Sequence, residues 1–158
     1  MGTNSSTRQL LSKIWHNQKI IDHNNRTIQS MRDDLERIRY AAEGVKAIRY
    51  NSQRIQAAAD DRMPDVVADL IEAEEKDLQR ISELTLENNR LEMERAALIQ
   101  NILNLDNPRC SEFLYKRYVE SKRIGEIQDE MKFKTYNACT NFHAYSLRVY
   151  LKKNSIIK

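Results

Sequence analysis

The chain has 158 residues, of which only 3 are glycine and 2 are proline, while charged side chains make up 31% of it. This composition favours long helices and disfavours sheets, which need turns, so we expect an all-α protein. The net charge is +3, and the apolar runs are far too short to cross a bilayer. The first residues, Met1 to Arg8, are polar and lack the apolar core of a signal peptide. We therefore expect an intracellular protein with no membrane partner.

The first predicted element is a long helix in which apolar residues recur every seven positions, a pattern typical of coiled coils. One seam consists of Thr7, Ile14, Ile21, Ile28, Leu35 and Ala42. The second seam consists of Leu10, Asn17, Asn24, Met31, Ile38 and Val45. Buried asparagines in a seam lower stability but can fix register or partner number. The alternative is that Asn17 and Asn24 are hydrated because the N-terminal turns pack loosely.

The periodicity fades after Gly44, so we expect a connector over 44–64, with a bend or a short helix inside it and Pro64 at the start of the next helix. A second long helix is predicted from about Asp65 to Leu105. Its clearest seam consists of Leu70, Asp77, Leu84, Leu91, Leu98 and Leu105. This is not a basic leucine zipper, because the N-terminal end of the helix is acidic.

Neither long helix can bury its seam alone, so residues 1–105 should form an antiparallel helical hairpin, a coiled-coil dimerisation region. Two hairpins from two copies would close a four-helix bundle, which predicts a homodimer. The residues expected to hold the dimer are Ile14, Ile21, Ile28, Leu35, Leu84, Leu91 and Leu98.

Residues 106–158 have the helix order of a helix-turn-helix DNA-binding unit. Asp106 and Asn107 can cap a first helix from about Pro108 to Val119. Ser121 begins a break and can cap a second helix from about Ile124 to Met131. The segment 132–134 forms the turn, and Thr135 is the expected N-cap of a third helix. The residues expected to face the core from the third helix are Cys139, Phe142, Ser146, Val149 and Tyr150.

Charge divides the chain into three parts and indicates where nucleic acid would bind. The net charge is +5 over 1–59, −7 over 60–105 and +5 over 106–158, and no carboxylate side chain follows Glu130. Such a surface attracts phosphate, and asparagine, arginine and threonine can read base edges. An ordinary solvated helix face is the alternative for each polar residue alone. The DNA-binding candidates are Lys122, Arg123, Lys132, Lys134, Thr135, Tyr136, Asn137, Thr140, Asn141, Arg148 and Lys152. His143 is expected to pack between helices or contact phosphate.

The run from Leu114 to Ile127, with its Arg-Tyr-Val-Glu-Ser-Lys core, resembles the "L-x-x-R-Y-V-E-G-K-S-W-E-E-I-A" stretch of small phage and prophage proteins. The segment 143–147 resembles their "H-x-x-A-L" ending. These proteins are related to phage late-gene transcription regulators of the ArpU and RinA type, and their C-terminus is similar to the DNA-reading fourth region of primary sigma factors. The detailed match covers about the last 50 residues. Upstream it is architectural, with Met63-Pro64 where many members have a Met-Pro connector.

The resemblance implies a DNA-binding transcription regulator in the cytoplasm of a bacterial host. Two residues depart from the pattern. Gln128 replaces a tightly packed alanine and could hold the last two helices apart, and Lys132 stands near a turn glycine and would need an unfavourable positive φ. These departures favour a second class of function, a protein-interaction factor that uses the coiled coil and binds a regulatory protein or RNA polymerase.

An enzyme is the least favoured class, because the sequence has no glycine-rich phosphate loop and no nucleophile with an assigned base. Cys110 and Cys139 are far apart, and with three histidines they cannot form a zinc finger, so no metal or cofactor is expected.

Overall fold

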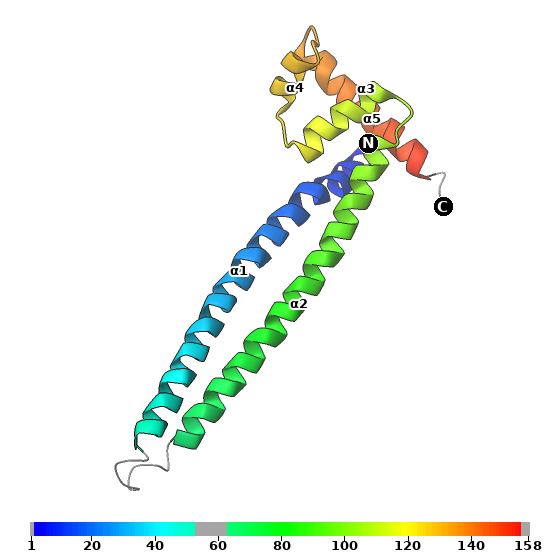
Figure 1. Ribbon diagram of the computed structural model, residues 1–158. Coiled ribbons are helices and arrows are strands. Elements are labelled where there is room, and N and C mark those ends of the chain that lie inside the picture. Colours follow the sequence, from blue (N-terminus) through cyan, green and yellow to red (C-terminus); the bar gives the residue numbers. More distant parts are fainter. Residues whose placement is uncertain (1, 53–62, 156–158) are drawn as a thin grey trace. The chain divides into compact units, whose positions relative to one another are not determined.

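The computed structural model describes residues 2–52 and 63–155, which are helical apart from short turns and contain no strand (Figure 1). This confirms the expected all-α class. The helices are α1 (Gly2–Ser52), α2 (Met63–Leu103), α3 (Pro108–Leu114), the π-helix η1 (Tyr115–Val119), α4 (Ile124–Glu130) and α5 (Tyr136–Ser155). They form two compact units, one made of Met1–Ile21 with Asn89–Lys158 and the other of Asp22–Asn88.

The unit Asp22–Asn88 pairs α1 with α2 in opposite directions through polar as well as apolar contacts. Asn24 Nδ2 donates to Asn88 Oδ1 at 2.9 Å, and Asn88 Nδ2 donates to Asn25 Oδ1 at 3.0 Å. Further along α1, the Arg39 guanidinium pairs with Glu74 at 3.0 Å. Asn24 and Asn88 are buried. Asn24, Asn25 and Asn88 are therefore hydrogen-bonded to one another across the two helices.

The helical part of the chain extends further than the seam pattern. α1 continues through Gly44 to Ser52, so the expected connector is helical over 44–52, and its residues 53–62 lie outside the described ranges. α2 begins at Met63, with Pro64 and Asp65 in its first turn. A proline is tolerated there because the first backbone N–H groups of a helix have no partner within it.

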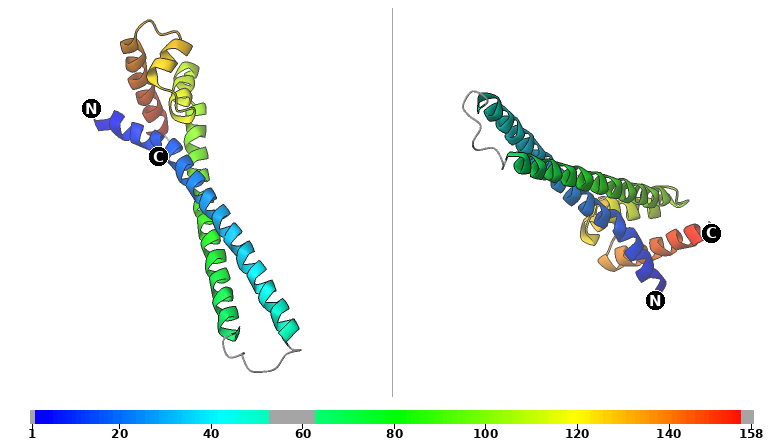
Figure 2. Two further views of the ribbon diagram at one scale, coloured as in Figure 1. Left: turned by 90° about the vertical axis from the view of Figure 1, so that its left-hand side faces the viewer. Right: turned by 90° about the horizontal axis from the view of Figure 1, so that it is seen from below.

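The other unit buries the start of α1, the end of α2 and the C-terminal helices around one core (Figures 1 and 2). Leu11 is fully buried in it while Leu10 is 40% exposed, so the second seam starts one residue later than predicted. Asn17 is buried as well, and its Nδ2 donates to Glu94 at 3.1 Å. The largest core side chains from the last three α-helices and η1 are Phe113, Leu114, Tyr118, Ile127, Leu147 and Tyr150.

The seven residues predicted to hold a dimer are all buried within a single chain, at 1–7% exposure. They are Ile14, Ile21, Ile28, Leu35, Leu84, Leu91 and Leu98. Their burial is explained without a second copy, because the seams of α1 and α2 already pack on each other. A second copy would have to contact other residues.

Candidate nucleic-acid interface

The first helix of the C-terminal segment is capped as expected and ends in a wide turn. Asn107 Oδ1 accepts from the backbone N–H groups of Arg109 (3.0 Å) and Cys110 (3.3 Å), and Pro108 stands at the first helical position. After Leu114 the helix continues as η1 to Val119, where the Glu120 N–H donates to the Tyr115 carbonyl at 3.1 Å. The predicted helix 108–119 is therefore continuous but not α-helical throughout.

The break before α4 differs from the prediction at Ser121. Ser121 has a φ of 57°, in the left-handed region, and does not cap the helix. The N-cap residue is Arg123, whose backbone N–H donates to the Glu126 carboxylate at 2.6 Å. The cap assigned to Ser121 is thus wrong, because α4 begins three residues after it.

The turn between α4 and α5 confirms two expectations. Lys132 has the predicted unfavourable backbone, with a φ of 57°. Thr135 is the N-cap of α5, since its Oγ1 accepts from the Ala138 N–H at 3.1 Å. The turn is closed by the Phe133 N–H, which donates to the Gln128 carbonyl at 2.9 Å.

Gln128 does not hold α4 and α5 apart, contrary to the expectation from the sequence. Its side chain is half-buried, while Ile127 beside it is fully buried in the shared core. The two helices are in contact, and the Cys139 thiol donates to the Ile124 carbonyl at 3.6 Å. The glutamine therefore sits at the edge of the helix pair, and the tight contact is made by its neighbour.

α5 buries a face slightly rotated from the predicted one. Cys139, Ser146 and Tyr150 are buried as expected, but Phe142 and Val149 are only half-buried. His143 and Leu147 take the remaining core positions. The His143 ring stacks on Phe113 with centroids 5.5 Å apart, and burial together with nearby Arg8 and Arg117 lowers its pKa to about 4. His143 is therefore a neutral packing residue rather than a phosphate contact.

The other side of α5 carries most of the predicted DNA-binding residues, and the helix contains no acidic residue. Nine of the eleven candidates are exposed: Arg123, Lys132, Lys134, Thr135, Tyr136, Asn137, Asn141, Arg148 and Lys152. Thr140 and Lys122 are half-buried. Tyr145, 45% exposed, was missed by the sequence reasoning. Its spacing of four from Asn141 and three from Arg148 places it on the same side.

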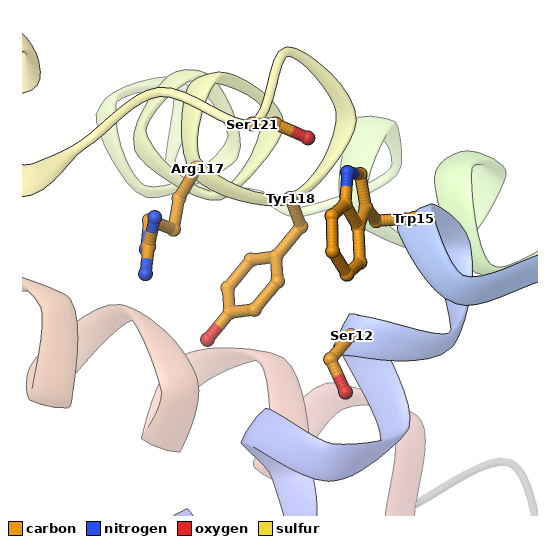
Figure 3. Close-up of a pocket in the computed structure, with 5 residues that line it drawn as sticks. All are labelled: Ser12, Trp15, Arg117, Tyr118 and Ser121. Carbon is orange, nitrogen blue, oxygen red and sulfur yellow. The ribbon is translucent and has the colours of Figure 1, made fainter. Parts of the chain in front are cut away.

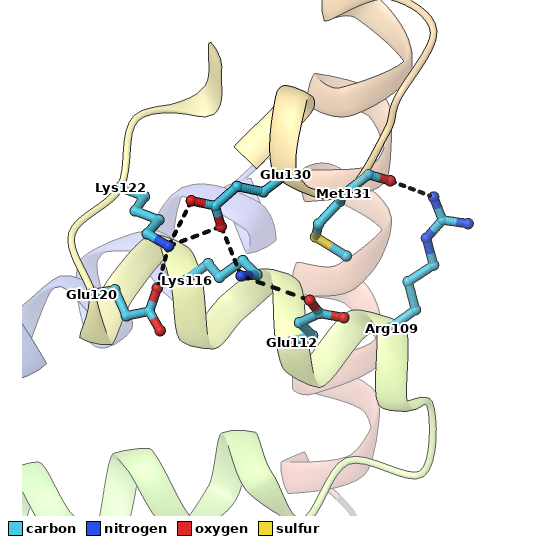
Figure 4. Close-up of polar contacts among 7 residues, drawn as sticks. All are labelled: Arg109, Glu112, Lys116, Glu120, Lys122, Glu130 and Met131. Carbon is cyan, nitrogen blue, oxygen red and sulfur yellow. Dashed lines mark hydrogen bonds and ion pairs between the residues drawn. The ribbon is translucent and has the colours of Figure 1, made fainter. Parts of the chain in front are cut away.

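Lys122 is engaged in an ion-pair cluster that joins the end of η1 to the end of α4 (Figure 4). Its Nζ lies 2.8 Å from Glu120 and 2.7 Å from Glu130, while Lys116 Nζ lies 2.7 Å from Glu130. The carboxylates of Glu120 and Glu130 raise the pKa of Lys122, and Lys116 followed by Lys122 lowers the pKa of Glu130. The charge of Lys122 is thus balanced within the protein.

Two further basic residues, Arg109 and Lys153, form contacts within the chain. The Arg109 guanidinium lies 4.8 Å from the ring centroid of Phe133, and its Nη2 is 3.5 Å from the Met131 carbonyl (Figure 4). Lys153 donates to Asp106 Oδ1 at 2.6 Å and to the Asn104 carbonyl. These bonds tie the turn after α4 to α3, and the end of α5 to the end of α2.

Within the described residues no helix is long and apolar enough to span a membrane. No three His, Cys, Asp or Glu side chains of that part of the chain are placed to hold one metal ion. Comparisons of the sequence with protein-family models and with curated proteins, and of the fold with solved structures, found no match.

Proposed function

We propose that residues 106–158 form a helix-turn-helix unit that binds double-stranded DNA, with α5 as the recognition helix. The observation that carries the proposal is the division of α5 into two faces. One face is buried against α3 and α4, and the other is acid-free and presents Asn137, Asn141 and Arg148 to solvent. An acid-free helix face meets the phosphate backbone without repulsion.

Base reading is assigned to the first two turns of α5. Asparagine can make paired hydrogen bonds to adenine, and a threonine methyl can contact thymine. Asn137, Thr140 and Asn141 all lie within this stretch. Arg148 lies about 16 Å along the helix axis from Asn137 and about 10 Å from Asn141 at 1.5 Å per residue, beyond the N-terminal residues that reach base edges in this motif. We therefore assign Arg148 and Lys152 to phosphate.

Phosphate contacts on the other flank come from the exposed cations Arg123, Lys132 and Lys134. None of these three side chains forms an ion pair among the residues that the structure describes. Lys122 is excluded from this set, because Glu120 and Glu130 neutralise it. The proposed footprint thus has three cations before Thr135 and two near the end of α5.

In this proposal the chain is a transcription regulator of phage or prophage type that acts as a homodimer on two half-sites. The buried seams of α1 and α2 leave a different face for the second copy. A row of uncharged, exposed residues follows the outer side of α2 with 4–3–4–3 spacing, the pattern of a coiled-coil seam. The row consists of Asn89, Met93, Ala96, Gln100 and Leu103.

The direct test is fluorescence anisotropy of the full chain on duplexes selected by it from a randomised pool. Binding should weaken about tenfold or more between about 50 mM and about 200 mM salt. Asn137→Ala should relax sequence preference, whereas Lys134→Ala should weaken all duplexes alike. Arg37→Gln, which removes an 81% exposed charge from the other unit, is the control. Folded protein that binds no duplex at the lower salt would rule the proposal out.

A second candidate is a protein-interaction factor that binds a regulatory protein or RNA polymerase. The exposed row on α2 supports it, since Met93 is 75% and Leu103 51% exposed. The polar seam supports it less than expected, because Asn17 and Asn24 are hydrogen-bonded within the chain. A photo-crosslinker at position 93 separates the candidates. It should capture a second copy if the chain is a dimeric regulator, and a different protein if it is an adaptor.

A further inference from the structure

A pocket of about 250 Å³ opens between the third and fourth turns of α1 and the end of η1 (Figure 3). The described residues that line it are Ser12 and Trp15 from α1, together with Arg117, Tyr118 and Ser121. All five belong to the unit Met1–Ile21 with Asn89–Lys158. We propose that this pocket binds a small aromatic anion, a carboxylate or phosphate carried on a single ring.

Two aromatic side chains supply the flat surfaces that such a ring needs. Trp15 is 47% exposed, and Lys19 Nζ lies 3.6 Å from the centroid of its ring. The Tyr118 hydroxyl is engaged 3.0 Å from His143 Nε2, so this residue offers its ring to the pocket rather than its polar end. Aromatic rings stack or meet edge to face over surfaces of this kind. The volume is below the range of about 300–1,000 Å³ for drug-sized ligands, which limits the occupant to a small molecule.

Two of the five lining residues, Trp15 and Arg117, carry hydrogen-bond donors only, and no carboxylate is among the described residues that line the pocket. The Trp15 indole N–H can only donate, and neither it nor the Ser121 hydroxyl has a hydrogen-bond partner among the described residues. Arg117 adds a guanidinium, of which Nη1 donates to the Lys122 carbonyl at 2.8 Å. Arginine is well suited to carboxylate and phosphate because it presents several donors in one plane. An excess of donors and positive charge selects an anion over a neutral ring.

The backbone beside the pocket has the irregularities that often accompany binding sites. η1 is a π-helix, and Ser121 directly after it has a φ of 57°. Arg117 lies within η1, and its Nε is buried without a hydrogen-bond partner in the described part of the chain. This proposal does not rest on DNA binding and is tested without DNA.

Trp15 is the only tryptophan of the chain, so its fluorescence reports on the pocket directly. The full chain is titrated with benzoate and with phenyl phosphate, and separately with neutral benzamide and with acetate and inorganic phosphate. The Trp15 fluorescence should change and saturate with benzoate, with phenyl phosphate or with both. Comparison of the two titrations shows whether a carboxylate or a phosphate is preferred. The affinities for benzamide, acetate and inorganic phosphate should each be lower than that for the preferred aromatic anion by about tenfold or more. No saturation with either aromatic anion, or equal response to benzamide, would overturn the proposal.

Variants then locate the site, with amide NMR spectra to show that each one is folded. Ser121→Gly relieves the positive φ and removes the hydroxyl, so it should weaken binding several-fold without unfolding the chain. Arg117→Gln should weaken it about tenfold, and Arg37→Gln in the other unit should leave it unchanged. Binding that is unaffected in both folded pocket variants would contradict the assignment.

Discussion

The hydroxyl of Tyr118 lies 3.0 Å from Nε2 of His143, and this buried hydrogen bond joins η1 to α5. Burial raises the pKa of Tyr118 and lowers that of His143, so both groups are neutral near pH 7. Each of the two polar groups gives the other a hydrogen-bond partner in place of water, and without a partner either group would be costly to bury. The position of α5 is therefore linked to the protonation of one histidine.

Acidification should destabilise the fold through His143. Its pKa is about 4 in the folded chain and near 6.5 when unfolded, so between these values only the unfolded chain binds the proton. The free energy of unfolding should fall by up to roughly 3 kcal/mol as the pH falls from 6.5 to 4, and this contribution is constant above 6.5. Urea unfolding at a series of pH values measures it. His143→Gln should flatten the profile, and an unchanged slope in that variant would refute the assignment.

Lys132→Gly should stabilise the chain, because glycine adopts the φ of 57° at this turn without the steric penalty of a side chain. We expect a gain of about 0.5–1 kcal/mol in the free energy of unfolding. Lys132→Ala removes the same charge but keeps the penalty, so it serves as the control and should bring no gain. Equal stability of the two variants would show that charge, not backbone, limits this turn.

Glu130→Gln should strengthen DNA binding if the proposed function holds. It removes the carboxylate that Lys116 and Lys122 share, so each lysine keeps a single partner, Glu112 at 3.7 Å and Glu120 at 2.8 Å, and the cluster gains one net positive charge. The slope of log K against log salt should steepen by up to about 1 unit, and affinity should rise most at low salt. Asp129→Asn removes a neighbouring exposed charge that holds no lysine in the described residues and should change the slope less. Equal slopes would mean that Lys116 and Lys122 stay away from DNA.

The buried asparagines should show strong coupling. Asn24→Leu alone leaves Asn88 Oδ1 without its donor and should cost about 1–3 kcal/mol of unfolding free energy. Replacing Asn24 and Asn88 together by leucine should recover most of that loss, because the partners left behind, Asn25 and Glu87, are exposed and can bond to water instead. A double-mutant cycle by chemical denaturation measures the coupling. Additive losses would indicate that each asparagine is satisfied independently.

Met93→Lys should disrupt self-association if the outer row of α2 is the dimer face. Met93 is 75% exposed in the single chain, so the substitution should leave the fold stable while placing like charges opposite each other in a dimer. Sedimentation velocity should show a shift toward monomer. Arg37→Gln, on α1 in the other unit, should not shift it. A dimer that survives Met93→Lys would move the interface elsewhere.

Local chemistry made several features predictable from the sequence. The cap at Asn107, the cap at Thr135 and the strain at Lys132 each follow from one residue and its immediate neighbours. The seven-residue spacing likewise located the buried seams, although burial alone did not say which chain would cover them. Sequence periodicity reports that a face is buried and is silent about its partner.

Features that depend on distant residues were not predictable. Lys122 was expected to be free, but Glu130, eight residues later in the sequence, lies beside it in space. His143 enters the core because Phe113 from α3 and Tyr118 from η1 pack against it. The buried residue between Thr7 and Ile14 is Leu11 and not Leu10, so the spacing there is four and then three. A repeat of seven is equally compatible with three and then four, so it could not decide between the two leucines.

The π-helix η1 decides where the first helix of the C-terminal segment can lose a residue. Its turn is closed by the Glu120 N–H on the Tyr115 carbonyl, five residues back, so this turn holds one residue more than an α-helical turn would. A deletion within the wide turn that spares Tyr118 would restore a regular α-helical turn and leave the later side chains close to their present phase relative to α3. The same deletion within α3 would turn every later side chain by about 100° relative to the residues before it. Tyr118 and Lys122 therefore tolerate a shorter η1 better than a shorter α3, although the two deletions remove the same length of chain.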